Sequence, residues 1–516
     1  MTTSHHCRRW LGFSARAAAL ALAFTCLPLA PATADELRSA VAQPPNVVLI
    51  VADDLGYREL GCFGQEKIRT PRLDALAAEG MRLTRHYAGN AVCAPSRCVL
   101  MTGKHPGHAI VRDNKSTPPE GQYPIPDAEV TVAELLHDAG YATGAFGKWG
   151  LGGPGSSGEP LRQGFDRFFG YNCQAHAHSY YPDYLWDNDQ RISLDNDPAV
   201  PGHAGLAEGA DPADPRSYDA FKGCDYAPDR IHEAALAFLR EQKDGPFFLY
   251  YPSIIPHVAL HIPDEELTPY LELDWHDPPF TRPKGGYTPH FTPRAAYAAM
   301  ITRLDREVGA ILDTLDVLGL ADNTLVIFTS DNGATHLNEE VDVDFFASVG
   351  KLRGLKGSLY EGGIRVPTIV RWPDHVAPGS ESDFVSGFED WLPTILDAAG
   401  HAAEVPPGLD GISLVPTLTS DDARASPARR PFLYREFAGY GGQQCVFAGR
   451  WKAIRQQLRK GPSPTELYDL DADPSESHNV AAEHPEVVTR LEALMAREHT
   501  VSPVFPIAGL GDAAAR

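Results

Sequence analysis

Two hydrophobic patterns alternate along the first two-thirds of the chain. Continuous apolar runs, typical of strands buried on both faces of a parallel sheet, occupy residues 46–52, 141–146, 247–251 and 324–329, with a further strand candidate at 364–372. Helical periodicity or helix-end residues mark the intervening segments 70–80, 93–103, 131–139, 229–242, 293–318 and 391–399. This alternation predicts an α/β fold, a large mixed, mostly parallel sheet sandwiched by helices.

Two stretches depart from this alternation. Residues 150–225 are rich in Gly, Pro, Asp and aromatic residues and have little periodicity, so we expect long loops there, over the site. Residues 417–430 have the composition of a linker. After the linker, short strands at 432–436, 444–448 and 451–456 and a helix over 483–498 predict a smaller C-terminal α+β domain, an antiparallel sheet plus a helix.

The N-terminal segment has the pattern of a secretory signal peptide. Three arginines precede an apolar run over 17–29, and Ala32-Thr33-Ala34 has the small residues of a cleavage site. The apolar run is too short for a good transmembrane span, and no later stretch could span a bilayer. We therefore expect residues 1–34 to be removed and the mature protein to be exported, either to the periplasm or out of the cell, by the Sec or the twin-arginine route.

The chain is acidic, with 45 basic and 68 acidic side chains and a formal net charge of −23. Three of the basic side chains lie in the predicted signal peptide, so the mature chain would carry 42 bases against 68 acids, a net charge of −26. Such a surface argues against nucleic acids and anionic membranes as partners. Any site for an anion must therefore be built from a local group of cations.

Oxygen-bearing side chains follow the carboxyl ends of two predicted strands. Asp53 and Asp54 come directly after residues 46–52, and Asp331 and Asn332 follow residues 324–329. Ligands of open α/β sheets bind at this edge, and oxygen donors without His or Cys favour Ca²⁺ or Mg²⁺. Either pair alone is explained more simply as an acidic turn.

The segment Cys93-Ala94-Pro95-Ser96-Arg97-Cys98-Val99-Leu100-Met101-Thr102-Gly103 is the most informative in the chain. Pro95 suits a first helical turn and Gly103 a helix end, so Cys93 would start a helix. The unpaired N–H groups of a helix start attract a tetrahedral anion, and Arg97, one turn along, could clamp it. The plain alternative is a buried structural cysteine beside a helix cap.

This segment resembles the signature of the sulfatase family, Cys-x-Pro-Ser-Arg-x-x-x-x-Thr-Gly. Residues 52–57 and 330–333 resemble the family's two metal-binding segments. The resemblance implies that a formylglycine-generating enzyme oxidises Cys93 to formylglycine during maturation. It also implies a Ca²⁺ site, with Mg²⁺ as the alternative cation, formed by Asp53, Asp54, Cys93, Asp331 and Asn332.

Further segments extend the resemblance over about residues 45 to 500. Lys148 in Gly147-Lys148-Trp149 and Lys356 in Gly354-Leu355-Lys356-Gly357 resemble sulfate-binding lysines, and His257 resembles the family's histidine at the bridging ester oxygen. Residues 466–474 resemble part of the family's C-terminal domain. The resemblance thus implies a catalytic sulfatase domain at 35–420 and a smaller C-terminal domain at 421–516.

One position departs from the family pattern. The family commonly has Gly-Lys-Trp-His, and this chain has Gly150 in place of that histidine. The missing imidazole would help to expel sulfate, and either His176 or His178 could supply it. We favour His178, because a His-x-x-Tyr-Pro arrangement would let the aromatic pair Tyr180-Tyr181 fix its ring. Both histidines could instead serve structure or contact substrate.

The resemblance implies hydrolysis of sulfate monoesters through a covalent sulfo-enzyme. Asp331 would act as the base, Arg97, Lys148 and Lys356 would stabilise the sulfate oxygens, and His257 would protonate the leaving group. Export and the aromatic residues Tyr180, Tyr181 and Trp186 would suit a sulfated carbohydrate. The alternatives are a phosphonate or phosphate ester hydrolase on the same fold and a non-catalytic protein that binds sulfated glycans.

Overall fold

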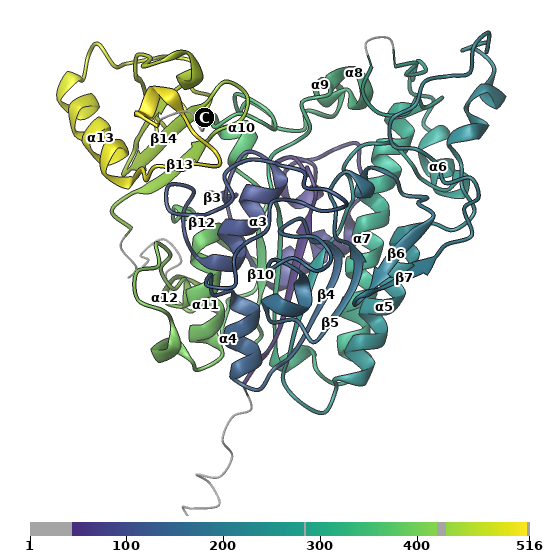
Figure 1. Ribbon diagram of the computed structural model, residues 1–516, viewed down its shortest axis with the longest axis horizontal. Coiled ribbons are helices and arrows are strands. Elements are labelled where there is room, and N and C mark those ends of the chain that lie inside the picture. Colours follow the sequence, from purple (N-terminus) through teal and green to yellow (C-terminus); the bar gives the residue numbers. More distant parts are fainter. Residues whose placement is uncertain (1–43, 283–284, 421–429, 513–516) are drawn as a thin grey trace, which may run out of the picture. The chain divides into compact units, whose positions relative to one another are not determined.

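The computed structural model describes residues 44–282, 285–420 and 430–512 (Figure 1). Its main sheet consists of β1 (Asn46–Ala52), β2 (Met81–Leu83), β4 (Ala142–Lys148), β5 (Arg167–Tyr171), β6 (Tyr184–Asp187), β7 (Gln190–Ser193), β8 (Phe247–Pro252), β9 (Thr324–Ser330), β10 (Ile369–Arg371) and β11 (Ser380–Ser382). The strand order is β11-β2-β10-β9-β1-β8-β4-β5-β6-β7. The central strands β9, β1, β8, β4 and β5 run parallel, while β10 and β6 pair antiparallel with them. The predicted α/β class is confirmed.

Helices cover both faces of this sheet, which explains the continuous apolar run of β1 (Figure 1). Val48, Ile50 and Ala52 pack into one core with α2 (Pro71–Glu79), α5 (Ala227–Glu241) and α7 (Pro293–Val317). Val47, Leu49 and Val51 pack into a second core with α3 (Cys93–Thr102), α4 (Val132–Asp138) and α11 (Trp391–Ala398). Because side chains of a strand alternate between faces, both sets must be apolar.

A second, antiparallel sheet follows in the C-terminal part. It consists of β13 (Leu433–Phe437), β14 (Gln443–Ala448), β15 (Trp451–Arg455) and β16 (Glu466–Asp469), in that order. One face packs against α13 (Pro485–Glu498). The other face packs against residues of the first part of the chain, including Leu359 and Ile364, and Lys452 of β15 forms a buried ion pair of 3.0 Å with Glu361.

Several elements differ from the sequence expectation. The strand expected over 364–372 begins only at Ile369, because Ile364 ends the short helix α10 (Glu361–Ile364). The region expected to be loops contains β5, β6 and β7, and β16 was not predicted. These are short strands at or near sheet edges, so they lack the long apolar runs of the central strands.

The remaining short elements are β3 (His86–Tyr87), β12 (Ser386–Gly387), α6 (Asp264–Leu271), α8 (Asn338–Val341), α9 (Val343–Phe346) and α12 (Val415–Leu418). Helix α12 occupies the start of the expected linker, and residues 421–429 lie outside the described residues, as does the expected signal peptide. Within the described ranges, no helix has the length and apolar character needed to cross a membrane.

Candidate active site

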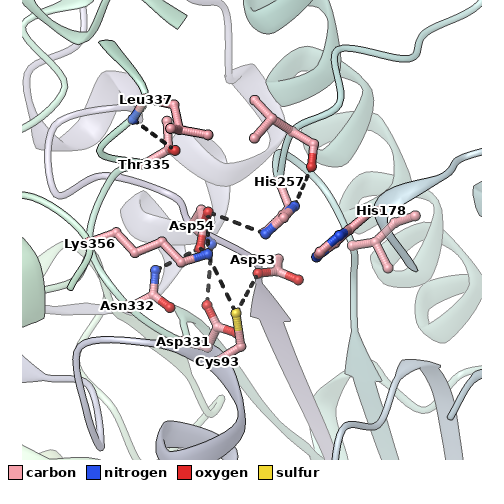
Figure 2. Close-up of polar contacts among 12 residues, drawn as sticks. Asp53, Asp54, Cys93, His178, His257, Asp331, Asn332, Thr335, Leu337 and Lys356 are labelled. Atoms are coloured by element: carbon pink, nitrogen blue, oxygen red, sulfur yellow. Dashed lines mark hydrogen bonds and ion pairs between the residues drawn. The ribbon is translucent and has the colours of Figure 1, made fainter. Parts of the chain in front are cut away.

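The carboxyl ends of four adjacent parallel strands bring the predicted site residues together (Figure 2). Asp53 and Asp54 follow β1, Asp331 follows β9, and Lys148 ends β4. The loop after β8 carries His257. The backbone N–H of Asp54 donates to Asp331 Oδ1 at 3.2 Å, so this contact joins the two acidic segments across neighbouring strands.

Cys93 is the first residue of α3 and is only 1% exposed. Its Sγ lies 3.4 Å from Asp53 Oδ1, 3.6 Å from Lys148 Nζ and 3.7 Å from Lys356 Nζ. Burial, and next the charge of Asp53, raise the pKa of the Cys93 thiol to about 12. An unmodified thiol here stays protonated and is therefore a poor nucleophile.

Three cations pair with the carboxylates around Cys93, of which Arg97 and Lys148 are buried and Lys356 is partly buried. Lys148 Nζ lies 2.6 Å from Asp53 Oδ2, and Lys356 Nζ lies 2.7 Å from Asp54 Oδ1. Arg97 donates through Nε and Nη2 to Asp331 Oδ2 at 3.0 and 2.8 Å. Buried charges are tolerated only when paired in this way.

Arg97 differs from its expected role as a clamp on an external anion. Besides the two bonds to Asp331, its Nη1 donates to the backbone carbonyl of Lys148, and Nη2 lies 3.4 Å from Asp53 Oδ2. The guanidinium therefore lies among the carboxylates and holds them in place. The two lysines, in contrast, line the cavity in front of Cys93.

The neighbouring carboxyls of Asp53 and Asp331 have pKa values shifted in opposite directions. Burial alone would raise the pKa of Asp53, but the surrounding cations, Lys148 above all, outweigh it and hold that pKa well below its usual range. Burial, and next the negative charge of Asp53, raise the pKa of Asp331 to about 6. Of these two carboxyls, Asp53 is therefore the one that stays ionised more firmly.

His257 is buried, and one of its two ring nitrogens is hydrogen-bonded to the backbone. Its Nδ1 donates to the backbone carbonyl of Val258, which leaves Nε2 facing Asp54 Oδ2 at 3.7 Å. Burial, and next the positive charge of Lys356, hold the pKa of His257 well below its usual range. The imidazole is therefore neutral, with the Nε2 lone pair directed to the polar cluster.

A cavity of about 380 Å³ opens onto this cluster. Its inner wall includes Cys93, Lys148, His257 and Lys356, and its outer wall includes Gln174, Tyr287, His336, Tyr440, Asp113 and Asn114. The cavity thus joins two ammonium groups, an imidazole and a helix start. That combination suits a tetrahedral anion attached to a polar group.

Comparison with known proteins assigns the chain to a family. Residues 45–401 match the model of the family described as Sulfatase, and residues 355–500 match the model described as N-sulphoglucosamine sulphohydrolase, C-terminal. The first match spans more than half of the chain. The chain belongs to the sulfatase family.

Individual sulfatases are similar over nearly the whole chain. Human arylsulfatase A is 34% identical over 486 residues, covering 88% of each chain. The N-acetylgalactosamine-6-O-sulfatase of Bacteroides thetaiotaomicron is 30% identical and covers 88% of this chain and 93% of its own. The solved structure of Ps i-CgsB in complex with k-i-k-neocarrahexaose has a TM-score of 0.71 at 27% identity, covering 88% of this chain and 92% of that one. This sulfatase is accordingly a sulfuric ester hydrolase.

The sulfatase family implies a divalent metal, and the residues present fit one. Ligand atoms of Asp53, Asp54, Cys93 and His257 all lie within 4.8 Å of one another. Asn332 donates from Nδ2 to Asp54 Oδ1 at 2.8 Å, while its buried Oδ1 has no hydrogen-bond partner among the described residues. Such an orphaned oxygen costs about 1–3 kcal/mol, and a hard cation would satisfy it.

Asp331, also predicted as a ligand, accepts at both oxygens. Its Oδ1 accepts from the Asp54 N–H and its Oδ2 accepts from Arg97. Both oxygens of Asp53 and of Asp54 are engaged in the same way, so Asp331 lies beside the other oxygen donors and its oxygens keep lone pairs.

Gln174 lies beside Gly150, the position at which sulfatases commonly have a histidine. Gly150 has a φ of +82°, and a Cβ placed on it would lie 2.7 Å from Gln174 Nε2. Gln174 is 4% exposed and lines the cavity. A histidine at position 150 would therefore require Gln174 to move.

Of the two histidines proposed to replace that imidazole, the structure brings only His178 to the cavity (Figure 2). Its ring stacks on His257 with centroids 5.1 Å apart, and its Nδ1 lies 2.9 Å from His203 Nε2. His176 instead packs against Tyr184, with ring centroids 4.3 Å apart. His257, His203 and Tyr287, rather than the Tyr180-Tyr181 pair, thus hold the His178 ring.

The expected sugar-stacking role of Tyr180, Tyr181 and Trp186 is wrong. These side chains are only 0%, 4% and 7% exposed, and Tyr180 donates its hydroxyl to backbone carbonyls, among them that of His257. The tyrosines that do line the cavity are Tyr287 and Tyr440, which no motif in the sequence marks. Both lie in irregular segments, where no periodicity shows which way a side chain faces.

Proposed function

We propose that this sulfatase hydrolyses sulfate monoesters on carbohydrates, with formylglycine at position 93 as the nucleophile. The position of Cys93 carries the proposal, because its Sγ lies at a helix start, between Asp53 Oδ1 and the two lysine ammonium groups. The aldehyde hydrate would supply one hydroxyl to attack sulfur and a second to expel sulfate. A formylglycine-generating enzyme would be the maturation partner.

Asp53, Asp54, Asn332 and residue 93 would hold the divalent cation, Ca²⁺ in our proposal and Mg²⁺ as the alternative, with Asp331 beside them. The cation would polarise a sulfate oxygen and lower the pKa of the attacking hydroxyl. Asp331 is our candidate for the base that takes its proton. Arg97 orients Asp331 and Asp53 through the bonds described above, so we assign it a positioning role.

Lys148 and Lys356 would stabilise the charge that builds on the sulfate oxygens. Each Nζ lies within 3.7 Å of Cys93 Sγ, so a sulfur bound to residue 93 would lie between two ammonium groups. Donors placed in advance around developing charge make the largest single contribution in many enzymes. A cation on Asp53 and Asp54 would also release both lysines from their present carboxylate partners.

His257 would protonate the leaving alkoxide through Nε2, the ring nitrogen left free by the bond to Val258. Nε2 would take up that proton when the anionic sulfate ester binds and offsets the charge of Lys356, which helps to hold the pKa of His257 down in the free enzyme. We assign the second proton transfer, at the remaining hydroxyl of residue 93, to His178. Burial, and next His257, hold the pKa of His178 well below its usual range, so its imidazole is neutral before this step.

Two observations support a carbohydrate as the leaving group. The similar Bacteroides enzyme is an N-acetylgalactosamine-6-O-sulfatase, and Ps i-CgsB was solved with a neocarrahexaose. The cavity in front of Cys93 is lined mainly by polar side chains, as a sugar with many hydroxyls requires. Export to the periplasm or the medium, which the N-terminal sequence predicts, would place the enzyme where such polymers occur.

The substrate class is tested with purified enzyme and three matched aryl esters. We expect kcat/KM for 4-nitrophenyl sulfate to exceed that for 4-nitrophenyl phosphate and for a 4-nitrophenyl phosphonate monoester by at least about tenfold. Release of 4-nitrophenol is read by absorbance. A preference for either phosphorus ester would replace our proposal with a phosphonate or phosphate ester hydrolase.

Cation binding is tested by thermal unfolding. Removal of the cation with EDTA should lower the melting temperature, and Ca²⁺ at about 100 times its Kd should restore about 2.7 kcal/mol of unfolding free energy. Asn332→Ala should reduce this restoration, because it removes a proposed ligand. The control Asn90→Ala removes another buried amide, one hydrogen-bonded to Glu436 and Ala91, and should keep the full calcium effect.

Equal calcium effects in both variants would exclude Asn332 as a ligand. Repeating the titration with Mg²⁺ separates the two candidate cations.

A further inference from the structure

The active-site cavity shares a wall with a second groove. Asp113 and Asn114 line both, and we call the second the outer groove, which has a volume of about 410 Å³. Asn114 Oδ1 accepts the backbone N–H of Ala94 at 3.0 Å, so the shared wall is attached one residue from Cys93. The outer groove is therefore the hollow next to the cavity on the side of Asp113 and Asn114.

The rest of the outer groove comes from distant parts of the chain. Lys115 follows the shared wall, Arg459 comes after β15, and Phe505 and Asp512 belong to the segment after α13. The C-terminal part thus adds a cation, Arg459, to a groove that shares Asp113 and Asn114 with the cavity in front of Cys93. None of these residues belongs to the sulfatase motifs in the sequence.

Four ionisable side chains line the outer groove, and the two cations are less engaged than the two carboxyls; the four are Lys115, Arg459, Asp113 and Asp512. Lys115 is exposed and has no carboxylate partner within the described residues; its Nζ lies 5.9 Å from the ring centroid of Phe505. Arg459 is half exposed, and its pair with Asp113 is loose at 3.7 Å. Asp512 adds little, because its two oxygens accept from His499 and the Ile507 N–H at 3.0 and 2.9 Å.

These two accessible cations lie together on a chain with a net charge of −23. Long-range repulsion by the acidic surface works against a polyanionic substrate, so local cations are needed where its charges bind. The outer groove supplies two of them beside the sulfate-ester site. This arrangement suits an anionic group carried on the same molecule as the ester.

We propose that the outer groove binds a second anionic group of the substrate, a sulfate or a carboxylate on a sugar next to the one that is desulfated. The inference rests on the proposed function and narrows its substrate to an oligosaccharide of at least two units with two or more negative charges. Lys115 and Arg459 are the specificity-determining residues. They act on binding of the distant group and leave the chemistry at residue 93 unchanged.

The test compares substrates with and without the second charge. We would measure kcat and KM for the wild type and for the double variant Lys115→Ala/Arg459→Ala. The substrates are 4-nitrophenyl sulfate and sulfated disaccharides whose second sugar bears a sulfate, a carboxylate or no charge. In the double variant, KM for a doubly charged disaccharide should rise about tenfold, equivalent to about 1.4 kcal/mol. Its kcat should stay the same, as should both constants for the singly charged substrates.

Lys460→Ala is the matched control, because Lys460 is exposed and adjacent to Arg459 but does not line the outer groove. It should leave every constant unchanged. The sulfate and carboxylate arms show which anion the groove prefers. The proposal is overturned if KM for the doubly charged disaccharides stays within twofold of wild type, or if KM rises equally for singly charged substrates.

A binding measurement separates this proposal from the proposed function. In the Cys93→Ala protein, which cannot turn over an ester by the proposed route, calorimetry should show the same tenfold loss of affinity for the doubly charged disaccharide when Lys115 and Arg459 are replaced. If the wild type hydrolyses no sulfate ester but this loss of affinity is found, the proposed function is wrong and the outer groove is still an anion-binding site. If the wild type is active and no loss of affinity is found, only the proposal for the outer groove is wrong.

Discussion

Replacement of Cys93 by alanine is expected to lower kcat for sulfate release by at least about 10⁴-fold, as loss of a covalent nucleophile does in other hydrolases. The groups close to Sγ are Asp53, Lys148 and Lys356, and none of them can form an ester with sulfur and then release it. An unoxidised Cys93→Ser variant should be similarly inactive. A serine has one hydroxyl group, so after attacking sulfur it has no second hydroxyl to expel the sulfate. Sulfate release is measured by ion chromatography.

Cys98→Ala is the matched control for this prediction. Cys98 is buried in the same helix but lies outside the cavity, so its replacement should cost packing energy and leave kcat within a few-fold of wild type. Peptide mass spectrometry of active wild type should find an aldehyde at position 93. Active protein with an intact thiol throughout would contradict the proposed nucleophile.

The second large effect is expected at His257. His257→Gln should lower kcat for a sugar sulfate by about 10³-fold, within the range for loss of a general acid. The loss should be much smaller for 4-nitrophenyl sulfate, because 4-nitrophenolate departs without being protonated. The measurement is the dependence of kcat on the pKa of the leaving alcohol, which should be steeper in the variant than in wild type.

His261→Gln controls for the removal of a buried imidazole nearby. The His261 side chain is buried and bonds to Thr288 Oγ1 at 2.8 Å, away from the cavity lining. Its replacement should reduce activity equally for good and poor leaving groups, through stability alone. The same uniform loss in His257→Gln would assign His257 a structural role.

The sheet was predictable because its central strands are buried on both faces. For β1, the expected and observed bounds coincide, since every position from Val47 to Ala52 belongs to one of the two cores and Asn46 is buried as well. The strand at Ile369 was predicted too long, because Ile364 and Val366 are equally apolar but serve a helix end and a loop. An apolar side chain reports burial, and it does not by itself distinguish between elements.

The grouping of the site residues was predictable for a similar reason. Side chains that follow parallel strands must meet at one sheet edge, whatever lies between them in the sequence. The partners within that group were not predictable: Arg97 turned inward to Asp331, and Gln174 came to lie beside Gly150. Both depend on the paths of loops and on distances of a few ångströms, which residue spacing does not determine.

The complete burial of α3 also bears on the order of events in biosynthesis. All ten residues of this helix are enclosed, including Cys93 and the Pro95 and Arg97 that follow it. The oxidation of Cys93 that we propose requires a second enzyme to reach this side chain, and the native fold encloses both Cys93 and the residues that follow it. On this proposal the oxidation precedes folding of α3, and a molecule that folds first would keep its thiol and stay inactive.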